Sequence, residues 1–443
     1  MLLGGVGAPH YEEHLLFGQC AILLARHGIR AALTHINTRK CPRSKLDHPA
    51  ENKMLEGAPV AYEAQGEVPL SFETVRAAVS HNHHRTPLLL MDLELVRSKI
   101  RRFRAAMPRV RIHYAVKANS HPDVLRVMLQ ERASFEVASL AELEGLLALG
   151  AKAPDIFYSN PIKPRDYIEH AARSGVQWFA VDSIDELHKI ASVKADARLF
   201  MRIETQNLGS DWPLTGKFGV SVPEAAALME EAVRVRADVA GVSFHVGSQC
   251  RNLENWRIGV ENAKVAFELM RKLGLKPLLL NIGGGFPVRY TKPIPTIEAI
   301  GASVNRAIAD LPADMRVMAE PGRYLVSDCA WLVARVIGTA VRQGTRWVYL
   351  DAGIFHGLME ALEGLEYDIR ASASGAAIPC TVAGPTCDSL DVVVRDRMLP
   401  GDLAAGDFVY IPNAGAYTTA YSTWFNGFPP PETVMLQHVE AGA

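Results

Sequence analysis

The stretch R-I-H-Y-A-V-K-A-N-S, residues Arg111–Ser120, decides how the rest of the chain is interpreted. It predicts a short buried strand over Ile112–Val116 that ends on Lys117. Burial disfavours the charged ammonium form, so we expect the pKa of this lysine to be lowered and its amine to be able to attack a carbonyl. A strand-end lysine that reaches the surface is the alternative. Lys117 is therefore a candidate Schiff-base lysine, provided that the rest of the chain supplies a cofactor site around it.

Length and composition narrow the possible functions. A chain of 443 residues is too long for one ordinary core, so we expect at least two domains. Lys+Arg number 47 and Asp+Glu 48, and this balance argues against nucleic acid and anionic membranes as partners. No apolar run reaches the roughly 18 residues of a membrane span. The sequence thus predicts a soluble cytoplasmic protein that acts on small molecules or on another protein.

The cysteines point to the same compartment. Six are present, Cys20, Cys41, Cys250, Cys329, Cys380 and Cys387, and they form neither a C-x-x-C pair nor a zinc spacing. In a chain of this size the pattern fits free thiols in a reducing cytosol better than a disulfide framework. The segment His10–His14 formally matches an H-x-x-E-H zinc pattern, but no third ligand is identifiable, so no metal site is predicted.

From Thr86 onward, short apolar runs alternate with amphipathic segments of helical length. The expected strands are Ile112–Val116, Ser134–Val137, Ile156–Tyr158, Trp178–Val181, Leu199–Ile203, Gly241–Val246, Pro277–Ile282 and Arg316–Ala319. Segments expected to be helical include Leu140–Leu149, Pro164–Ser174, Ile184–Val193, Pro223–Val235 and Asn255–Leu273. Such a repeated alternation is typical of a (β/α)8 barrel, with the active site at the carboxyl ends of the strands. A doubly wound open sheet is the alternative.

The pattern changes near residue 330. The later runs Trp331–Val341, Arg346–Asp351, Ala377–Ala383 and Asp407–Ile411 are β-rich and separated by Gly, Pro and Asp turns. We therefore expect three parts: an N-terminal extension of unclear role over 1–75, a barrel over 76–330 and an all-β domain over 331–443. The extension shows helical periodicity over Glu12–Ala32.

Polar side chains and glycines follow the expected strands. Besides Lys117 these are Glu136, Arg202, Glu204, His245, Ser248, the run Gly283, Gly284 and Gly285, and the turn that holds Glu320, Gly322 and Arg323. A glycine run offers backbone N–H groups to a phosphate, and a phosphate site after the seventh and eighth strands recurs in barrels. Arg323 could pair with that phosphate. With Lys117, these parts indicate a phosphorylated carbonyl cofactor, and pyridoxal phosphate (PLP) fits best.

Two further residues fit this cofactor. The carboxylate of Glu320, placed beside the pyridine nitrogen, would hold that nitrogen protonated and make the ring a strong electron sink. His245 could stack on the ring face, although a histidine on a buried strand is also explained as an ordinary core residue.

Seven motifs resemble one family, the fold-type III PLP-dependent decarboxylases that act on ornithine, lysine and diaminopimelate. They are H-Y-A-V-K-A-N at 113–119, F-H-V-G-S-Q at 244–249, N-I-G-G-G-F-P at 281–287, A-E-P-G-R-Y at 319–324, G-P-T-C-D-S-L-D at 384–391, N-A-G-A-Y-T at 413–418 and F-N-G-F at 425–428. They occur in the family's order over roughly 86–428, and the chain is most similar to the ornithine decarboxylase-like members.

The resemblance implies a role for each matching residue. Lys117 would carry PLP as a Schiff base that the substrate exchanges, and decarboxylation would pass through a quinonoid. The cofactor would be bound by Arg202, His245, Ser248, Gly283, Gly284, Gly285, Glu320, Gly322, Arg323 and Tyr417. Cys387 would protonate Cα after carbon dioxide leaves, and Asp388, with Tyr417, would contact the substrate. The resemblance also implies a homodimer in which Cys387 and Asp388 enter the partner's active site.

The substrate is suggested by the residue after Cys387. Diaminopimelate decarboxylases usually carry glutamate there, whereas Asp388 resembles the ornithine and lysine enzymes of polyamine biosynthesis. Ornithine and lysine differ by one methylene, worth only about 1–3 kcal/mol, so the sequence leaves both open. A larger or carrier-linked amino acid also stays open. The acidic loop of the ornithine enzymes is not securely aligned here, and Glu363, Glu366 and Asp368 are candidates for it.

Two other functions of this fold agree less well with the sequence. A racemase of this fold places arginine at the pyridine nitrogen, and Glu320 argues against it. A catalytically silent, protein-binding homologue would have lost its cofactor residues, whereas Lys117, Arg323, Tyr417 and Cys387 are all present.

Overall fold

A computed structural model of the chain describes residues 70–82, 85–214 and 216–436. The expected helix Glu12–Ala32, the His10–His14 pattern, Cys20 and Cys41 lie outside these residues. Among the described residues, no helix combines the length and the apolar character that a membrane span needs.

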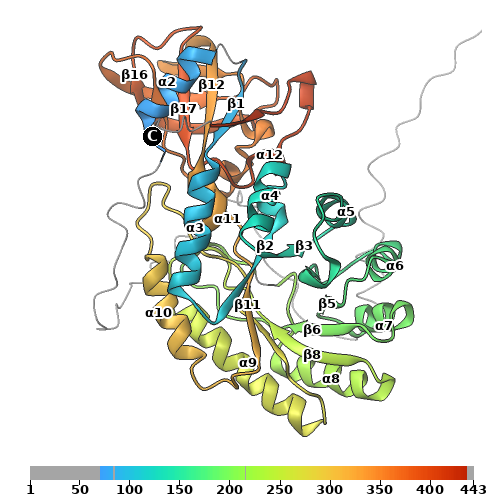
Figure 1. Cartoon of the computed structure of the whole chain (residues 1–443). Helices are drawn as coiled ribbons and strands as arrows, with labels where there is room; N and C mark the ends of the chain where they lie inside the picture. Colours follow the sequence, from blue (N-terminus) through green and yellow to red (C-terminus); the bar gives the residue numbers. More distant parts are fainter. Residues whose placement is uncertain (1–69, 83–84, 215, 437–443) are drawn as a thin grey trace, which may run out of the picture. The chain divides into compact units, whose positions relative to one another are not determined.

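Eight parallel strands close into a barrel, as the alternation of apolar runs predicted (Figure 1). Around the barrel they are β10 (Leu279–Asn281), β11 (Arg316–Ala319), β2 (Val110–Ala115), β3 (Ser134–Val137), β4 (Ile156–Tyr158), β5 (Trp178–Val181), β6 (Arg198–Arg202) and β8 (Asp238–Ser243). The strands are mostly apolar in their middle residues because side chains on both faces are buried there, inside the barrel and under the helices. β8 begins and ends earlier than the expected Gly241–Val246. Because the strand ends at Ser243, His245 follows it instead of lying within it.

Helices follow the strands and cover the barrel. They are α4 (Pro122–Gln130), α5 (Leu140–Ala148), α6 (Arg165–Arg173), α7 (Ile184–Val193), α8 (Val222–Val235), α9 (Glu254–Lys272) and α10 (Ile297–Ala307). After β11 only the short α11 (Arg323–Val326) forms. The remaining place is filled by α3 (Leu93–Ala106), which precedes β2 and contacts both α10 and α4. The ring of helices is therefore completed by a segment from before the first barrel strand.

The sequence of α3 explains why it packs there. Asp92 caps the helix, accepting from the backbone N–H groups of Glu94 and Leu95. Val96, Ile100 and Phe103 follow at helical spacing and are buried.

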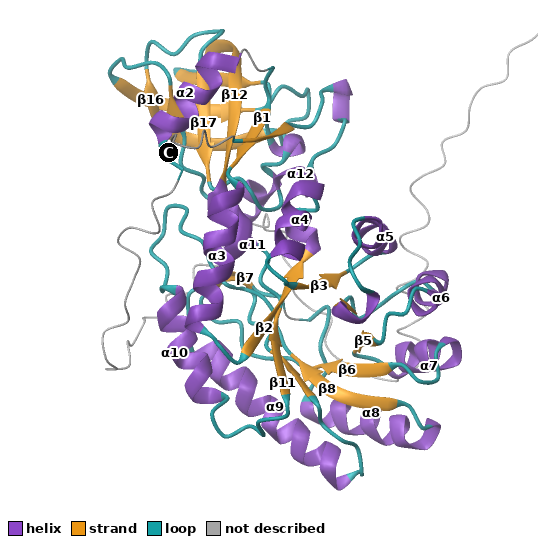
Figure 2. Cartoon of the chain, viewed as in Figure 1, coloured by secondary structure: helices purple, strands orange, loops and turns teal. Residues whose placement is uncertain are grey.

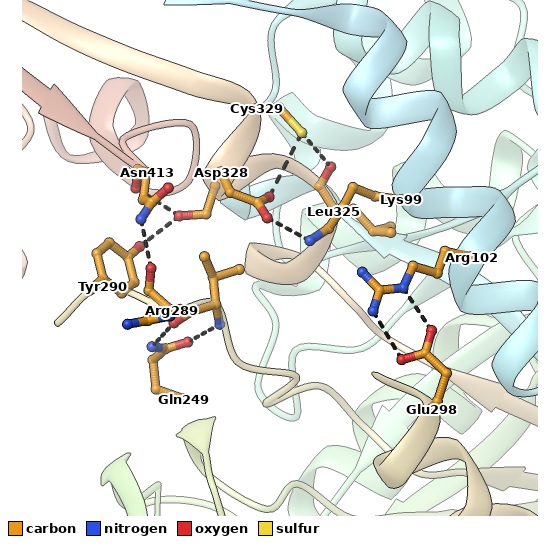
Figure 3. Close-up of polar contacts among 12 residues, drawn as sticks. Lys99, Arg102, Gln249, Arg289, Tyr290, Glu298, Leu325, Asp328, Cys329 and Asn413 are labelled. Atoms are coloured by element: carbon orange, nitrogen blue, oxygen red, sulfur yellow. Dashed lines mark hydrogen bonds and ion pairs between the residues drawn. The ribbon is translucent and has the colours of Figure 1, made fainter. Parts of the chain in front are cut away.

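Two ion pairs fix α3 in the ring (Figure 3). Lys99 Nζ lies 2.6 Å from Asp328 Oδ2, and Arg102 forms a bidentate pair with Glu298 of α10, at 2.7 and 3.0 Å.

The C-terminal part is a mixed sheet, as the β-rich pattern predicted (Figure 2). Its strands lie in the order β14 (Arg370–Ala371), β17 (Phe408–Pro412), β12 (Ala330–Arg342), β13 (Thr345–Leu350), β15 (Ala377–Ala383) and β16 (Val392–Pro400), with β1 (Leu88–Met91) pairing with β12 and with β18 (Glu432–Met435). Helix α2 (Phe72–Asn82) contributes Val75 and Val79 to the core cluster that contains Trp331.

One strand pairs differently from what the linear division at residue 76 suggests. β1 runs antiparallel to β12, with Leu88 opposite Val333 and Met91 opposite Ala330. Leu88 and Leu90 are buried in the same core cluster as Val333. The chain thus contributes a strand to the C-terminal sheet before it enters the barrel, because this apolar run buries its side chains against β12.

Candidate active site

A cavity of about 540 Å³ lies at the carboxyl ends of the barrel strands. Ten of the predicted site residues line it: Lys117, Arg202, His245, Ser248, Gly284, Gly285, Glu320, Gly322, Arg323 and Tyr417. Gly283 precedes this lining, and Cys387 and Asp388 lie outside it. Tyr417 lies in the loop after β17. The backbone of this loop is hydrogen-bonded to the turn that carries Lys117, because the Tyr417 N–H donates to the Ala118 carbonyl at 2.8 Å.

Lys117 lies in the turn Val116–Ala118 directly after β2. Its Nζ is 3.0 Å from Oε2 of Glu136, which is buried on the neighbouring strand β3. The side chain lines the cavity and is 45% exposed. Desolvation by the surrounding protein disfavours the ammonium, but the charges of Glu136, Tyr417 and Glu320 outweigh it and raise the pKa of Lys117 above its ordinary value. The expectation of a lowered pKa is therefore wrong for the chain without cofactor, because the sequence did not reveal that a carboxylate faces the amine.

Glu320 follows β11 and is held through one oxygen. Ser159 Oγ and Asn281 Nδ2 both donate to Oε1, at 2.7 and 2.6 Å. Among the described residues no group bonds to Oε2, which leaves it available to a ring nitrogen. Burial and the nearby Glu136 raise the pKa of Glu320. A carboxyl with a raised pKa shares a proton more evenly with a pyridine nitrogen than an ordinary carboxylate does.

His245 is neutral in this site. Its Nδ1 accepts from the Gly247 backbone N–H at 3.0 Å, so the other ring nitrogen carries the proton. Burial, together with the positive charges of Arg202 and Lys117, holds the pKa of His245 well below its usual range. A neutral, oriented imidazole is suited to stacking on an aromatic ring.

The glycine run needs glycine for steric reasons. A Cβ on Gly284 would lie 2.8 Å from the Glu320 carbonyl oxygen and 3.0 Å from His245 Nε2. Gly285 has φ +92°, and a Cβ there would lie 2.3 Å from the Gly247 carbonyl oxygen. The backbone can therefore approach both the histidine and a bound phosphate.

Arg323 is buried beside this run and has an unexpected partner. Its guanidinium forms a bidentate pair with Glu360, at 2.8 and 2.5 Å, and Nη2 donates to Ser248 Oγ at 3.3 Å. Its centre lies 4.8 Å from the centroid of the Tyr417 ring. Arg323 Nε is buried with no hydrogen-bond partner among the described residues. A lysine, a glycine cradle, an arginine with an unused donor and a buried carboxylate are the groups that PLP needs, so the cavity fits the cofactor.

Cys387 and Asp388 lie in the loop between β15 and β16, where Cys387 is exposed and Asp388 is partly buried. The Cys387 backbone N–H donates to Asn426 Oδ1 at 3.1 Å, and Sγ lies 3.2 Å from the same oxygen. Asp388 Oδ1 accepts from the Leu390 N–H at 2.8 Å.

Among the three candidates for the acidic loop, Asp368 is paired with Arg370 and Arg397. Glu366 lies 3.5 Å from Thr291 Oγ1, and Glu363 is exposed. None of the three lines the cavity.

Four residues of the site were given no role from the sequence. Glu136, Ser159 and Asn281 each lie at or just after the end of a barrel strand. This position already singles out Glu136 in the sequence, and the same signal could have found Ser159 and Asn281. Glu360 carries no such signal, because it comes from the 3-10 turn Met359–Glu363 of the C-terminal part. No group of His, Cys, Asp and Glu that could hold a metal ion occurs in the described part of the chain.

Comparison with known proteins agrees with this geometry. Residues 93–327 match the family model of the pyridoxal-dependent decarboxylases, pyridoxal binding domain. The lysine/ornithine decarboxylase of Selenomonas ruminantium is 34% identical over 356 residues, which are 80% of this chain and 90% of that protein. The chain therefore belongs to the PLP-dependent decarboxylases that include the ornithine and lysine enzymes. It is an amino-acid decarboxylase with PLP as its cofactor.

Solved structures show the same similarity. The lysine/ornithine decarboxylase of Vibrio vulnificus complexed with cadaverine superposes with a TM-score of 0.76 at 35% identity, covering 83% of this chain and 98% of that one. The arginine decarboxylase of Paramecium bursaria Chlorella virus bound to agmatine gives 0.78 at 28% identity, covering 82% and 100%.

Proposed function

We propose that the protein decarboxylates an L-amino acid with a distal amine, of the ornithine or lysine type, to the corresponding amine and carbon dioxide. The observation that supports this most directly is the cavity in which Lys117, Glu320 and Arg323 come together. The relatives named for lysine and ornithine support the substrate class. Asp388, one carboxylate for one distal ammonium, agrees with it.

This activity assigns a task to each predicted site residue that lines the cavity. PLP, when bound, supplies an electron sink for the bond at Cα that loses carbon dioxide. Lys117 would hold the cofactor covalently until the substrate's α-amine takes its place. Glu320 would keep the ring nitrogen protonated, and His245 would pack on the ring face. The phosphate would be bound by Arg323, Ser248 and Tyr417, by the backbone of Gly283, Gly284 and Gly285, and by the Gly322 turn. Arg202 would add a positive charge to the pocket.

We also propose that two copies of the chain share their active sites. Cys387 would deliver a proton to Cα, and Asp388 would hold the distal amine, in the partner's cavity. Both lie outside the cavity of their own chain. Two nearby apolar side chains are largely exposed, as expected at an interface: Leu390, just after Asp388, at 58%, and Trp424, two residues before Asn426, at 69%. Mixing inactive Lys117→Ala with inactive Cys387→Ala should restore part of the activity if sites are shared; no restoration on co-refolding would contradict sharing.

A substrate panel tests the proposed function. Carbon dioxide release should be measured with L-ornithine, L-lysine, L-arginine and diaminopimelate on PLP-loaded protein. Turnover of ornithine or lysine above the other two supports the proposal. Bound PLP without turnover of either contradicts it.

A larger substrate is the second candidate. Lys217, beside Phe218, lines the cavity and places a cation where a substrate with a distal carboxylate would profit from it. Preferential turnover of diaminopimelate in the same panel would favour this candidate.

We further propose a three-part division of the chain at residues 75 and 330, a role in polyamine biosynthesis and a cytoplasmic location, which all agree with the proposed activity. The described cysteines, which are all free thiols, agree with a reducing compartment.

A further inference from the structure

We propose that Asn426 is a positioning residue for Cys387, whose side-chain amide oxygen orients the thiol and keeps its proton in place. The inference rests on the proposed function, in which Cys387 donates a proton to Cα. It concerns how this cysteine is held as a proton donor before the reaction begins.

The geometry identifies the atom that faces the thiol. The Cys387 backbone N–H can only donate, so the Asn426 atom 3.1 Å away is the amide oxygen and not the nitrogen. The same oxygen lies 3.2 Å from Sγ. Because this oxygen only accepts, the sulfur must direct its S–H toward it. Any other orientation of the thiol would place a sulfur lone pair against the oxygen's lone pairs, so the contact fixes the direction in which the S–H points.

Both partners are held by their own segments. Asn426 has φ +55° and ψ +14°, a left-handed conformation that asparagine tolerates better than most residues. The preceding Thr423 N–H donates to the Phe355 carbonyl at 2.9 Å. On the other side, Asp391 accepts from the Thr386 N–H and hydroxyl at 3.0 and 2.7 Å, which fixes the loop just before Cys387.

The proton step balances without any further reactant. After carbon dioxide leaves, the electron pair at Cα takes the thiol proton: a C–H bond forms, the S–H bond breaks and a thiolate remains. The thiolate then recovers a proton from water. Asn426 acts before this step, by presenting a protonated thiol in one orientation, and therefore acts through Cys387 and not on the substrate.

Two variants separate the hydrogen bond from the backbone turn. Asn426→Gly keeps a residue that adopts positive φ freely but removes the amide oxygen, whereas Asn426→Asp keeps an acceptor at that place. The probe is iodoacetamide, applied to the full-length, PLP-loaded protein over a range of pH, with Cys387 labelling followed by peptide mass spectrometry. Equal thermal midpoints of the three proteins establish that the fold is retained.

We expect Asn426→Gly to be labelled several-fold faster at neutral pH, because its thiol is no longer held by a hydrogen bond, and Asn426→Asp to be labelled no faster than the native protein. An equal rise in both variants would show a change of access only and would overturn the proposal, as would equal rates in all three proteins.

The labelling needs no substrate, so it is independent of the proposed function. If labelling behaves as expected but no diamino acid is decarboxylated, the positioning of the thiol stands and the assigned activity fails. If Asn426→Gly decarboxylates the substrate as fast as the native protein while its thiol is altered, the contact has no part in proton delivery, and the proposal is overturned.

Discussion

The Nζ atom of Lys117 lies 3.0 Å from Oε2 of Glu136, which the register of β2 and β3 places opposite Ala115. This ion pair favours the protonated form of the amine, whereas a covalent bond to PLP requires the neutral form. Formation of a Schiff base would therefore require Lys117 to lose a proton and its ion pair with Glu136.

Replacing Glu136 by glutamine should speed cofactor capture at neutral pH. The substitution removes a charge that raises the pKa of Lys117, so a larger fraction of the amine is neutral. The rate at which the Schiff-base absorbance appears after PLP is added to the apoprotein, followed against pH, measures this. Glu144→Gln, a change on helix α5, is the control and should leave the profile unmoved. A profile at unchanged or higher pH in Glu136→Gln would contradict the role of the pair.

Ser159 and Asn281 should support Glu320 in catalysis. Each donates to Oε1, so losing one of them frees the carboxyl to rotate and further raises its pKa. We expect Ser159→Ala to lower kcat about tenfold and Glu320→Gln to lower it about 10²–10³-fold, the range for removing an electrostatic group from an active site. Steady-state kinetics measure both; KM effects with an unchanged kcat in Glu320→Gln would argue against a role at the ring nitrogen.

The pair between Arg323 and Glu360 should stabilise the protein more without PLP than with it. Both side chains are nearly buried, at 4% and 10% exposure, and Glu360→Ala leaves the guanidinium uncompensated, which costs about 3–5 kcal/mol. A bound phosphate would compensate part of this cost. Thermal unfolding of apo and loaded protein measures the difference. Glu363→Ala, an exposed change on the same turn, should have little effect.

An equal loss of stability in apo and loaded Glu360→Ala would mean that the cofactor phosphate does not reach Arg323.

Glu142 should make stability depend on pH. Burial and the neighbouring Glu136 raise its pKa to about 7. Its folded pKa therefore exceeds the unfolded value of about 4.3, the native state binds more protons between these values, and stability falls as pH rises through this window. Glu142→Gln, which keeps an acceptor for the Ala138 N–H, should stabilise the protein by on the order of 1–3 kcal/mol at pH 8 and have little effect near pH 4. Denaturant unfolding at the two pH values tests this; an effect of equal size at both would rule out titration of Glu142.

The sequence predicted the parts of the site that local chemistry reveals. Lys117, Glu320 and the Gly283–Gly285 run follow apolar runs, so a barrel brings them to one end, and the structure shows them there. The facing of Glu136 and Lys117 depends on the register between two strands, which the apolar pattern does not fix. This is why the direction of the Lys117 pKa shift was predicted wrongly.

Other features depend on segments far apart in the chain. β1 pairs with β12, and Arg323 pairs with Glu360 from the C-terminal part. Neither contact can be predicted from a short window of sequence, because only the tertiary fold brings the partners together.

The measurement that tests the central claim most directly is the absorbance spectrum of the PLP-loaded protein before and after L-ornithine or L-lysine is added, with carbon dioxide recorded and Lys117→Ala alongside. We predict a Schiff-base band that Lys117→Ala lacks and that one of the two diamino acids shifts while carbon dioxide is released. A band that neither amino acid moves, with no carbon dioxide, would contradict the proposed substrate class. A native protein without any band would contradict Lys117 as the residue that holds the cofactor.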